Sequence, residues 1–252
     1  MSELLTATQN GIRTLTLNRP EKRNALNSEL IASLTGAMRD AGRDDSLRAV
    51  VIRGEGKDFC SGADLEELRK ISSYSYEENL YDARKLVDLF TAIRTCPVPV
   101  IAAVHGRALA GGCGLATACD IVLAAATARF GYPEVKIGFV PAIVMAILRR
   151  NISEKRAFEL VTRGFDFSAE EAKEMGLVNQ IFPDAEFDGK VDDFAGEYSK
   201  VSASAVRLSK QLLYQMDGKN FFEAVDAGAI MNARARMTED CKQGVSRFLK
   251  KK

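Results

Sequence analysis

One acidic residue, Glu134, lies in a segment whose composition suits proton transfer. It follows Pro133 in the sequence FGYPEVKIGF at 130–139, just after a stretch expected to be a buried strand. A carboxyl group held among apolar neighbours keeps its proton to higher pH, which suits a general acid or base near neutrality. An ordinary surface glutamate in a loop fits this segment alone equally well.

Two other segments place glycine and small residues where a core would favour larger side chains. They are FCSGADL at 59–65 and GRALAGGCGLA at 106–116. Glycine between a strand and a helix lets a ligand approach the backbone closely and presents helix N-terminal amides. The second segment lacks the Gly-Lys-Ser/Thr of a Walker loop and matches the dinucleotide fingerprint poorly. An ordinary turn and close helix packing are the structural alternatives.

The remaining residue types exclude several kinds of chemistry. His105 is the only histidine, so neither a Ser–His–Asp triad nor a histidine metal site is expected. The chain has five cysteines and no CxxC pair, which argues against a disulfide scaffold and a zinc ribbon. Cys113 and Cys119 are expected to be packing residues rather than nucleophiles.

Composition indicates a globular protein with one large domain, or with one domain and a small appendage. Hydrophobic residues make up 46% of the 252 residues, and the net charge is +1. This charge balance gives no reason to expect nucleic acid or a membrane surface as the main partner. The start of the chain has no secretory signal pattern, and no apolar stretch is long enough to cross a bilayer. We therefore expect a cytoplasmic protein.

Elements that position these segments can be predicted from the spacing of apolar residues. Residues 3–8 and 12–18 flank Gln9-Asn10-Gly11, a hairpin signal. Residues 28–43 have helical spacing. Short apolar runs at 48–53, 97–104, 120–125 and 177–181 indicate buried strands, with helix-prone residues at 65–95 and two helices after 141. Strands alternating with helices predict an α/β fold with a mostly parallel sheet, and the chain after about 186 is expected to be helical.

Three further segments, taken in order with the three above, resemble the crotonase (enoyl-CoA hydratase/isomerase) family. The matching segments are NRPEKRNALN at 18–27, FCSGADL at 59–65, GRALAGGCGLATACD at 106–120, FGYPEVKIG at 130–138, 155–164 with FSAEEAKEMGLV at 167–178, and GVSRFL at 244–249. The resemblance implies a ClpP-like crotonase fold, a spiral ββα-type sheet core. It also implies an enzyme that acts on the C2–C3 double bond of an enoyl-CoA thioester.

By this resemblance, the backbone N–H groups of Ala63 and Gly111 form an oxyanion hole for the thioester carbonyl. Preorganised amides stabilise an enolate-like oxyanion, and one such donor is worth roughly 10²–10³ in rate. Glu134 matches the catalytic carboxylate. Hydratases of the family use a second glutamate to hold a water, and the matching position here is Gly114. Family members that shift a double bond often keep only the Glu134-type carboxylate, so isomerisation is favoured over hydration or dehydration.

The resemblance also implies where coenzyme A binds. The candidates are Lys22 and Arg23 for the phosphates, Ala25, Asp64 and Leu65 beside the adenine and pantetheine, and Phe248 and Lys251 from a neighbouring subunit. Cations with several donors suit phosphate oxygens, although a solvated charged loop and a basic tail are the plain alternatives. No cofactor beyond the CoA moiety of the acyl-CoA substrate and no metal is expected.

The same resemblance also predicts the domain boundaries and the oligomeric state. It implies a crotonase core at 1–199 and a helical oligomerisation region at 200–252, forming a homotrimer or a dimer of trimers. The large apolar residues at 141–148 and the tyrosines Tyr74, Tyr76 and Tyr81 are candidates for shaping the acyl pocket, or are simply core and surface residues. A non-catalytic or RNA-binding member of the fold is the rival interpretation, and the near-zero net charge counts against RNA.

Overall fold

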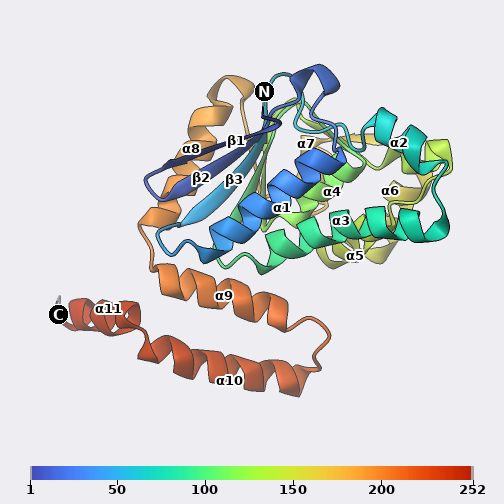
Figure 1. The fold of residues 1–252 in the computed structure, drawn as a ribbon. Coiled ribbons are helices and arrows are strands. Elements are labelled where there is room, and N and C mark those ends of the chain that lie inside the picture. Colours follow the sequence, from blue (N-terminus) through green and yellow to red (C-terminus); the bar gives the residue numbers. More distant parts are fainter. Residues whose placement is uncertain (1, 251–252) are drawn as a thin grey trace.

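A computed structural model describes residues 2–250 of the chain, and a six-stranded sheet forms its centre (Figure 1). The strands follow the spatial order β1-β2-β3-β4-β6-β9. They are β1 (Leu4–Gln9), β2 (Ile12–Leu17), β3 (Ala49–Gly54), β4 (Val100–Val104), β6 (Ile121–Ala125) and β9 (Gln180–Phe182). Only the β1–β2 hairpin is antiparallel; the other neighbours pair in parallel. The predicted hairpin and parallel sheet are confirmed.

Alternating side chains of the central strands enter two different layers. Val50 and Ile52 of β3 belong to the large core. Their neighbours Ala49 and Val51 pack in a smaller cluster with Val191 of the helix α8 (Phe187–Gly196). Both faces of the parallel sheet are therefore covered, which explains why these strands are apolar throughout rather than alternating.

Helices α1 (Ser28–Arg43), α3 (Tyr76–Thr95) and α4 (Gly111–Ala118) cover the face opposite α8 (Figure 1). Leu30, Leu34 and Met38 recur at helical spacing along α1 and are buried. Asn27 caps this helix by accepting a hydrogen bond from the Leu30 amide at 2.8 Å. The helix therefore begins and ends at the residues that its sequence predicts.

A second sheet of three short strands was not predicted. It contains β5 (Arg107–Leu109), β7 (Arg129–Gly131) and β8 (Asp166–Ser168). Three-residue strands are too short to show a period in the sequence. This sheet matters for the site because β5 leads directly into α4, and β7 leads into the 3₁₀ helix Pro133–Ile137 that carries Glu134.

The other helices complete the body and the C-terminal region. They are α2 (Leu65–Ile71), α5 (Ala142–Asn151), α6 (Glu154–Arg163), α7 (Ala169–Glu174), α9 (Ala203–Gln215), α10 (Phe221–Met237) and α11 (Glu239–Lys250), with 3₁₀ turns at Pro20–Lys22, Asp184–Glu186 and Glu197–Ser199. Figure 1 shows α10 and α11 set apart from the main body, with α9 lying between α10 and the body. Within the described residues the chain after β9 contains no strand, as predicted. The domain boundary at 199/200 lies just before α9 and stays a prediction.

Candidate active site

Two turns from distant parts of the sequence meet at the start of α4. Cys60 pairs with Ala108 of β5, and Ala63 pairs with Leu26, so the 59–65 segment is held between two others. A side chain at Gly62 would place its Cβ 2.8 Å from the Ala110 Cβ and 3.4 Å from the Gly111 nitrogen. A side chain at Gly112 would meet the Cys60 carbonyl oxygen at 2.3 Å. Glycine at both positions is therefore needed for the two turns to touch.

The backbone around the two candidate oxyanion amides is fixed on both sides. Leu26 donates to the Gly62 carbonyl at 2.7 Å and accepts from the Asp64 amide at 2.9 Å, which brackets Ala63. Gly111 is the first residue of α4, where a helical amide has no partner within its own helix. Ala110, just before it, has φ +50°, a region in which a non-glycine residue stores strain of about 1–3 kcal/mol. Neither the Ala63 nor the Gly111 amide donates a backbone hydrogen bond between elements of residues 2–250.

Ala63 and Gly111 line the same cavity, whose volume is about 580 Å³. Its walls come from the start of α1, from α2 and α3, and from Phe139 and Ile143 at the start of α5. Cavities of this size in proteins commonly bind small-molecule ligands. The structure thus brings together the two turns that the sequence singled out and opens them onto a space large enough for part of a substrate.

Glu134 is buried and has only 8% of its surface exposed. Burial raises the pKa of its carboxyl group above the ordinary value of 4.5, and a hydrogen bond from a backbone amide opposes the rise. Its Oε2 atom accepts no hydrogen bond within the described residues. A buried carboxyl oxygen without a partner is available to receive a proton from a ligand. The prediction of a raised pKa is confirmed.

Glu134 itself does not line the cavity that Ala63 and Gly111 share, and its link to the cavity wall is through the backbone. Phe139, a cavity residue, donates its amide to the Glu134 carbonyl at 3.0 Å. Burial raises the pKa of the Cys113 thiol to about 12, and the charge of Glu134 adds to the rise. Cys113 lies on the first turn of α4, two residues after Gly111. The carboxyl group is therefore within electrostatic reach of the helix that begins at the candidate oxyanion hole.

No side chain fits at position 114 without a rearrangement. A Cβ at Gly114 would lie 2.4 Å from Cγ2 of Val144 in α5 and 3.3 Å from Cζ of Phe90 in α3. Val144 is buried and β-branched, so it has few alternative rotamers. The side chain of Val144 fills the place of a side chain at position 114, where the family resemblance implies the second glutamate of a hydratase. The sequence indicated that residues 141–148 reshape the pocket but not that Val144 covers Gly114.

Arg19 was missed as a site residue. Its guanidinium is 9% exposed and binds Glu3 at 3.0 Å, the Ala25 carbonyl, and Asp64 at 2.7 Å. Ala25 precedes Leu26 and Asp64 follows Ala63, so Arg19 holds both strands of the Leu26–Ala63 pair. Asp64, predicted as a CoA contact, pairs with Arg19 and caps α2 by accepting from the Glu66 amide, and its contact with CoA stays a prediction. The only signal in the sequence was an arginine directly after an apolar strand.

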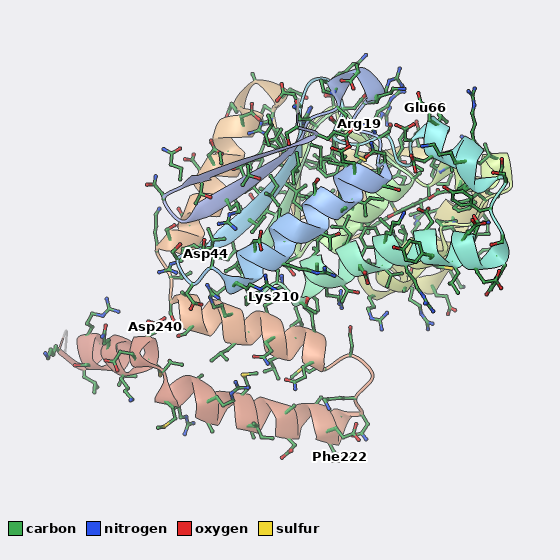
Figure 2. All side chains as sticks on the ribbon, in the orientation of Figure 1. Arg19, Asp44, Glu66, Lys210, Phe222 and Asp240 are labelled. Atoms are coloured by element: carbon green, nitrogen blue, oxygen red, sulfur yellow. The ribbon has the colours of Figure 1, made fainter. Side chains whose placement is uncertain are left out.

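Lys22, Arg23 and Ala25 of the predicted CoA residues occupy the loop between β2 and α1, and Leu65 is the first residue of α2. Figure 2 places Arg19 and Glu66 at the end of the molecule opposite α9–α11. There Lys22 forms an exposed ion pair with Glu66 at 2.7 Å. Arg23 is largely exposed and lies 3.9 Å from Asp58. Ala25 is buried, whereas Leu65 is 75% exposed at the start of α2.

The predicted residues of the C-terminal helix lie elsewhere. Phe248 is an exposed residue of α11, and Lys251 lies outside the described residues. Among the tyrosines, Tyr76 lines the cavity, whereas Tyr74 and Tyr81 do not. Among the described residues, the cavity lining includes no residue of α11.

The buried cysteines and His105 lie in surroundings that suit packing and backbone hydrogen bonding. All five cysteines are free, and Cys60, Cys96, Cys113 and Cys119 are buried. Burial raises the pKa of the Cys60 thiol to about 12, so the thiolate needed for nucleophilic attack is scarce. The His105 Nε2 atom lies 2.9 Å from the Gly56 carbonyl oxygen at the end of its strand. None of the helices within residues 2–250 combines the length and apolar character needed to cross a bilayer.

Comparison with known proteins agrees with the family resemblance of the sequence. The sequence matches the family described as enoyl-CoA hydratase/isomerase over residues 7–252. A putative enoyl-CoA hydratase of Thermus thermophilus is 42% identical, with 94% of this chain and 93% of that protein covered. The 2,3-dehydroadipyl-CoA hydratase of Escherichia coli is 35% identical, with 100% and 97% covered.

Solved structures agree with the sequence comparison. An enoyl-CoA hydratase of Mycobacterium smegmatis superposes with a TM-score of 0.96 at 34% identity, with 100% of this chain and 98% of that chain covered. Human enoyl-CoA hydratase domain-containing protein 3 superposes with a TM-score of 0.93 at 29% identity, with 99% and 98% covered. The predicted crotonase fold is confirmed. The chain belongs to the enoyl-CoA hydratase/isomerase family of acyl-CoA enzymes.

Proposed function

We propose that this protein is an isomerase that moves the double bond of a 3-enoyl-CoA to the 2-position. The observation that carries the proposal is that Val144 fills the place a Cβ at position 114 would take, which leaves no room there for a second catalytic acid. A hydratase needs two carboxylates to hold and polarise its water, whereas a double-bond shift needs only one base that returns the proton it removed.

The other buried acids support a single catalytic carboxylate. Within residues 2–250 the buried acidic side chains are Asp58, Asp64 and Glu134. Asp58 accepts from the Arg107 amide at 3.0 Å, and Asp64 pairs with Arg19. Both carboxylates already accept hydrogen bonds that fix the conformation of loops. Glu134 alone combines burial, a raised pKa and a carboxyl oxygen without a partner.

The proposed reaction uses the two amides and this one carboxylate. The thioester oxygen accepts hydrogen bonds from Ala63 and Gly111. The Glu134 carboxylate removes a proton from C2, and the electron pair spreads over the oxygen and the C3–C4 double bond as a dienolate. The same carboxyl group returns the proton at C4, so that the double bond lies between C2 and C3. Two preorganised amides stabilise the negative charge as it develops on oxygen.

Isotope incorporation tests the proposal directly. The enzyme is incubated in deuterated water with 3-enoyl-CoA and, separately, with 2-enoyl-CoA. Interconversion of the 3-enoyl and 2-enoyl thioesters without a 3-hydroxy product is the expected result, and deuterium enters C2 or C4 only to the extent that the Glu134 carboxyl group exchanges its proton with solvent during a turnover. Rapid formation of 3-hydroxyacyl-CoA would instead establish hydration, the activity named for the Thermus thermophilus and Escherichia coli relatives.

A paired substitution tests the role of Val144. Gly114→Glu alone should fold poorly because its Cβ meets Val144 and Phe90. Adding Val144→Ala removes the atom at 2.4 Å, so the double variant should regain stability and acquire hydratase activity. Thermal unfolding and a hydration assay report the two effects, with Val144→Ala alone as the matched control. If the single Val144→Ala variant already hydrated 2-enoyl-CoA, the missing acid would not be the limiting feature.

Oligomer state and location belong to the proposal as well. We infer that α9, α10 and α11 join copies of the chain into a trimer or a dimer of trimers. Large apolar side chains on these helices, such as Phe222 at 81% exposure, support this inference. We also infer a cytoplasmic location. RNA binding, the rival interpretation, gains no support from a net charge of +1.

A further inference from the structure

The first turn of α4 and the segment that carries Glu134 leave the small sheet from neighbouring strands. β5 and β7 pair in parallel; β5 leads into α4, and β7 leads into the 3₁₀ helix with Glu134. At the end of the paired strands, the Ala110 amide donates to the Gly131 carbonyl at 2.8 Å. Ala110 directly precedes Gly111, the candidate oxyanion donor. The distance between donor and base therefore depends on the few residues that follow this bond.

Tyr132 follows this bond directly, and its side chain is fully buried. Its hydroxyl lies 3.4 Å from the Thr117 hydroxyl, and the Cys113 thiol is its second hydrogen-bonding partner. The Thr117 hydroxyl donates in turn to the Cys113 carbonyl at 3.0 Å. Cys113 and Thr117 are four residues apart, so they share one face of α4. The Tyr132 hydroxyl thus bonds the Glu134 segment to the first two turns of the helix that Gly111 begins.

Other contacts of the Glu134 segment do not involve this hydroxyl. The Tyr132 ring lies with its centroid 6.5 Å from that of Phe167 in β8. A Cβ at Gly164, which ends α6, would lie 2.9 Å from Cγ1 of Val135 and 3.4 Å from the Tyr132 carbonyl oxygen. The 3₁₀ helix therefore packs closely against the end of α6. Among these contacts, only the hydroxyl joins the segment to α4 through a side chain.

The Tyr132 hydroxyl is not suited to transfer a proton to a substrate. Burial raises the pKa of this group well above its ordinary value, so it stays protonated. Tyr132 does not line the cavity that Ala63 and Gly111 share. Its hydroxyl therefore acts on the reaction only through the residues that it holds.

We propose that Tyr132 is a positioning residue that holds the Glu134 carboxyl group at a fixed distance from the Gly111 amide. The proposal rests on the proposed function only in the roles of Glu134 and Gly111, and it holds equally for isomerisation and for hydration. A reacting group that is displaced by about 1 Å can lose about 10²-fold in rate. Without the hydroxyl, the segment is free to shift against α4, which lowers the rate of the reaction rather than the affinity for the substrate.

Tyr132→Phe tests the proposal, because it keeps the ring and removes only the hydroxyl. We expect kcat to fall by roughly tenfold to 10²-fold while KM stays close to that of the native enzyme. Tyr214→Phe is the matched control: it removes a tyrosine hydroxyl that donates to Asp120, and it should lower Tm while leaving kcat unchanged. Near-UV circular dichroism at the assay temperature measures the folded fraction of each variant. A native kcat in folded Tyr132→Phe would overturn the proposal, and so would equal losses of kcat in both variants.

A double-mutant cycle tests whether the two hydroxyls act as one contact. Thr117→Val removes the partner hydroxyl and should lower kcat to a similar extent as Tyr132→Phe. The double variant should lose no more than either single variant, because residues that share one contact are not additive. Losses that multiply in the double variant would show that the hydroxyls act independently and would overturn the proposal. If Tyr132→Phe does not fold, Thr117→Val alone decides, since a native kcat in that variant contradicts the proposed contact.

Glu134→Gln separates this proposal from the proposed function. Loss of turnover in Glu134→Gln together with a native kcat in Tyr132→Phe would refute the positioning role alone. Retained turnover in Glu134→Gln would refute the proposed base itself. Hydration in place of isomerisation, found together with the expected loss in Tyr132→Phe, would refute isomerisation alone.

Discussion

At the scale of single residues, the protonation of Glu134 determines the pH dependence of both activity and stability. Burial raises the pKa of this carboxyl group. The base must be ionised, so kcat/KM should rise with pH through a value above 4.5. Glu134→Gln should lower turnover by about 10²–10⁴ and leave CoA affinity unchanged. A pH–rate series and CoA titration measure these effects, and retained turnover would remove Glu134 from the mechanism.

The stability effect of the same group has the opposite direction to that of a salt-bridged carboxylate. The folded state keeps the Glu134 proton to higher pH than the unfolded chain, whose pKa is about 4.3. The free energy of unfolding is therefore highest below the unfolded pKa and falls as the pH rises through the folded pKa. Denaturant unfolding from pH 4 upward should show this loss as a difference between the native enzyme and the Glu134→Gln variant, because carboxyl groups with a lowered pKa, such as Asp64, act in the opposite direction in both. The Glu134→Gln variant should lack this contribution, and identical profiles would contradict it.

Arg19 is expected to position the oxyanion amide of Ala63 without touching the substrate. Replacing it with lysine removes the planar guanidinium group, whose several N–H donors bind Asp64, the Ala25 carbonyl and Glu3 at the same time. Arg19→Lys should lower kcat by roughly tenfold or more. The upper limit is the roughly 10²–10³-fold loss of kcat expected when one oxyanion donor is removed. KM should change little. Arg39→Lys, an exposed arginine on α1, is the control, and a change confined to KM would show that Arg19 serves binding instead.

At the scale of elements, α9 is fixed to the main body by a buried ion pair. Figure 2 shows Lys210 on α9 facing the body. Its ammonium group lies 2.6 Å from Asp120 and donates to the carbonyls of Ile93 and Val98. Tyr214 donates to the second oxygen of Asp120. The pair thus joins α9 to the end of α3 and the start of β6.

Removing one member of this pair leaves the other charge buried and uncompensated. Lys210→Met should therefore lower the free energy of unfolding by about 3–5 kcal/mol in urea titration. The double variant Lys210→Met/Asp120→Asn should recover part of the loss, because no unpaired charge remains. Lys200→Met, at an exposed pair with Glu197, should cost less than about 1 kcal/mol. Equal losses in the two single variants would mean that the buried pair has no special role.

The sequence predicted long periodic elements well and short ones poorly. The hairpin at Asn10-Gly11, helix α1 and the four apolar strands were all found from local patterns. Strands β5, β7 and β8 were not, because three residues carry no measurable period. At the site, local sequence singled out three segments, and the family resemblance assigned roles in them to Glu134, Ala63 and Gly111. The clash between positions 114 and 144 and the contacts of Arg19 join distant segments, so only the folded chain reveals them.

At the scale of the whole molecule, the C-terminal helices expose more apolar surface than a monomer needs. Phe221 and Phe222 at the start of α10 are 74% and 81% exposed, and Ile230 and Met237 follow on the same helix. Figure 2 shows Phe222 at the outer end of α10, away from the main body. Exposed apolar patches of this kind usually mark an interface between proteins. The family resemblance implies that the partner is a second copy of this chain.

The double variant Phe221→Asp/Phe222→Asp should therefore weaken self-association. Light scattering coupled to size-exclusion chromatography should give a trimer or hexamer mass for the native protein and a smaller mass for the variant. Because assembly stabilises the folded chain by mass action, the Tm of the native protein should also rise with its concentration. Phe158→Asp, at an equally exposed phenylalanine on α6, should leave the mass unchanged. A native protein that stays monomeric at all concentrations would show that these helices serve another partner, and it would leave any contribution of α11 to the active site without a physical basis.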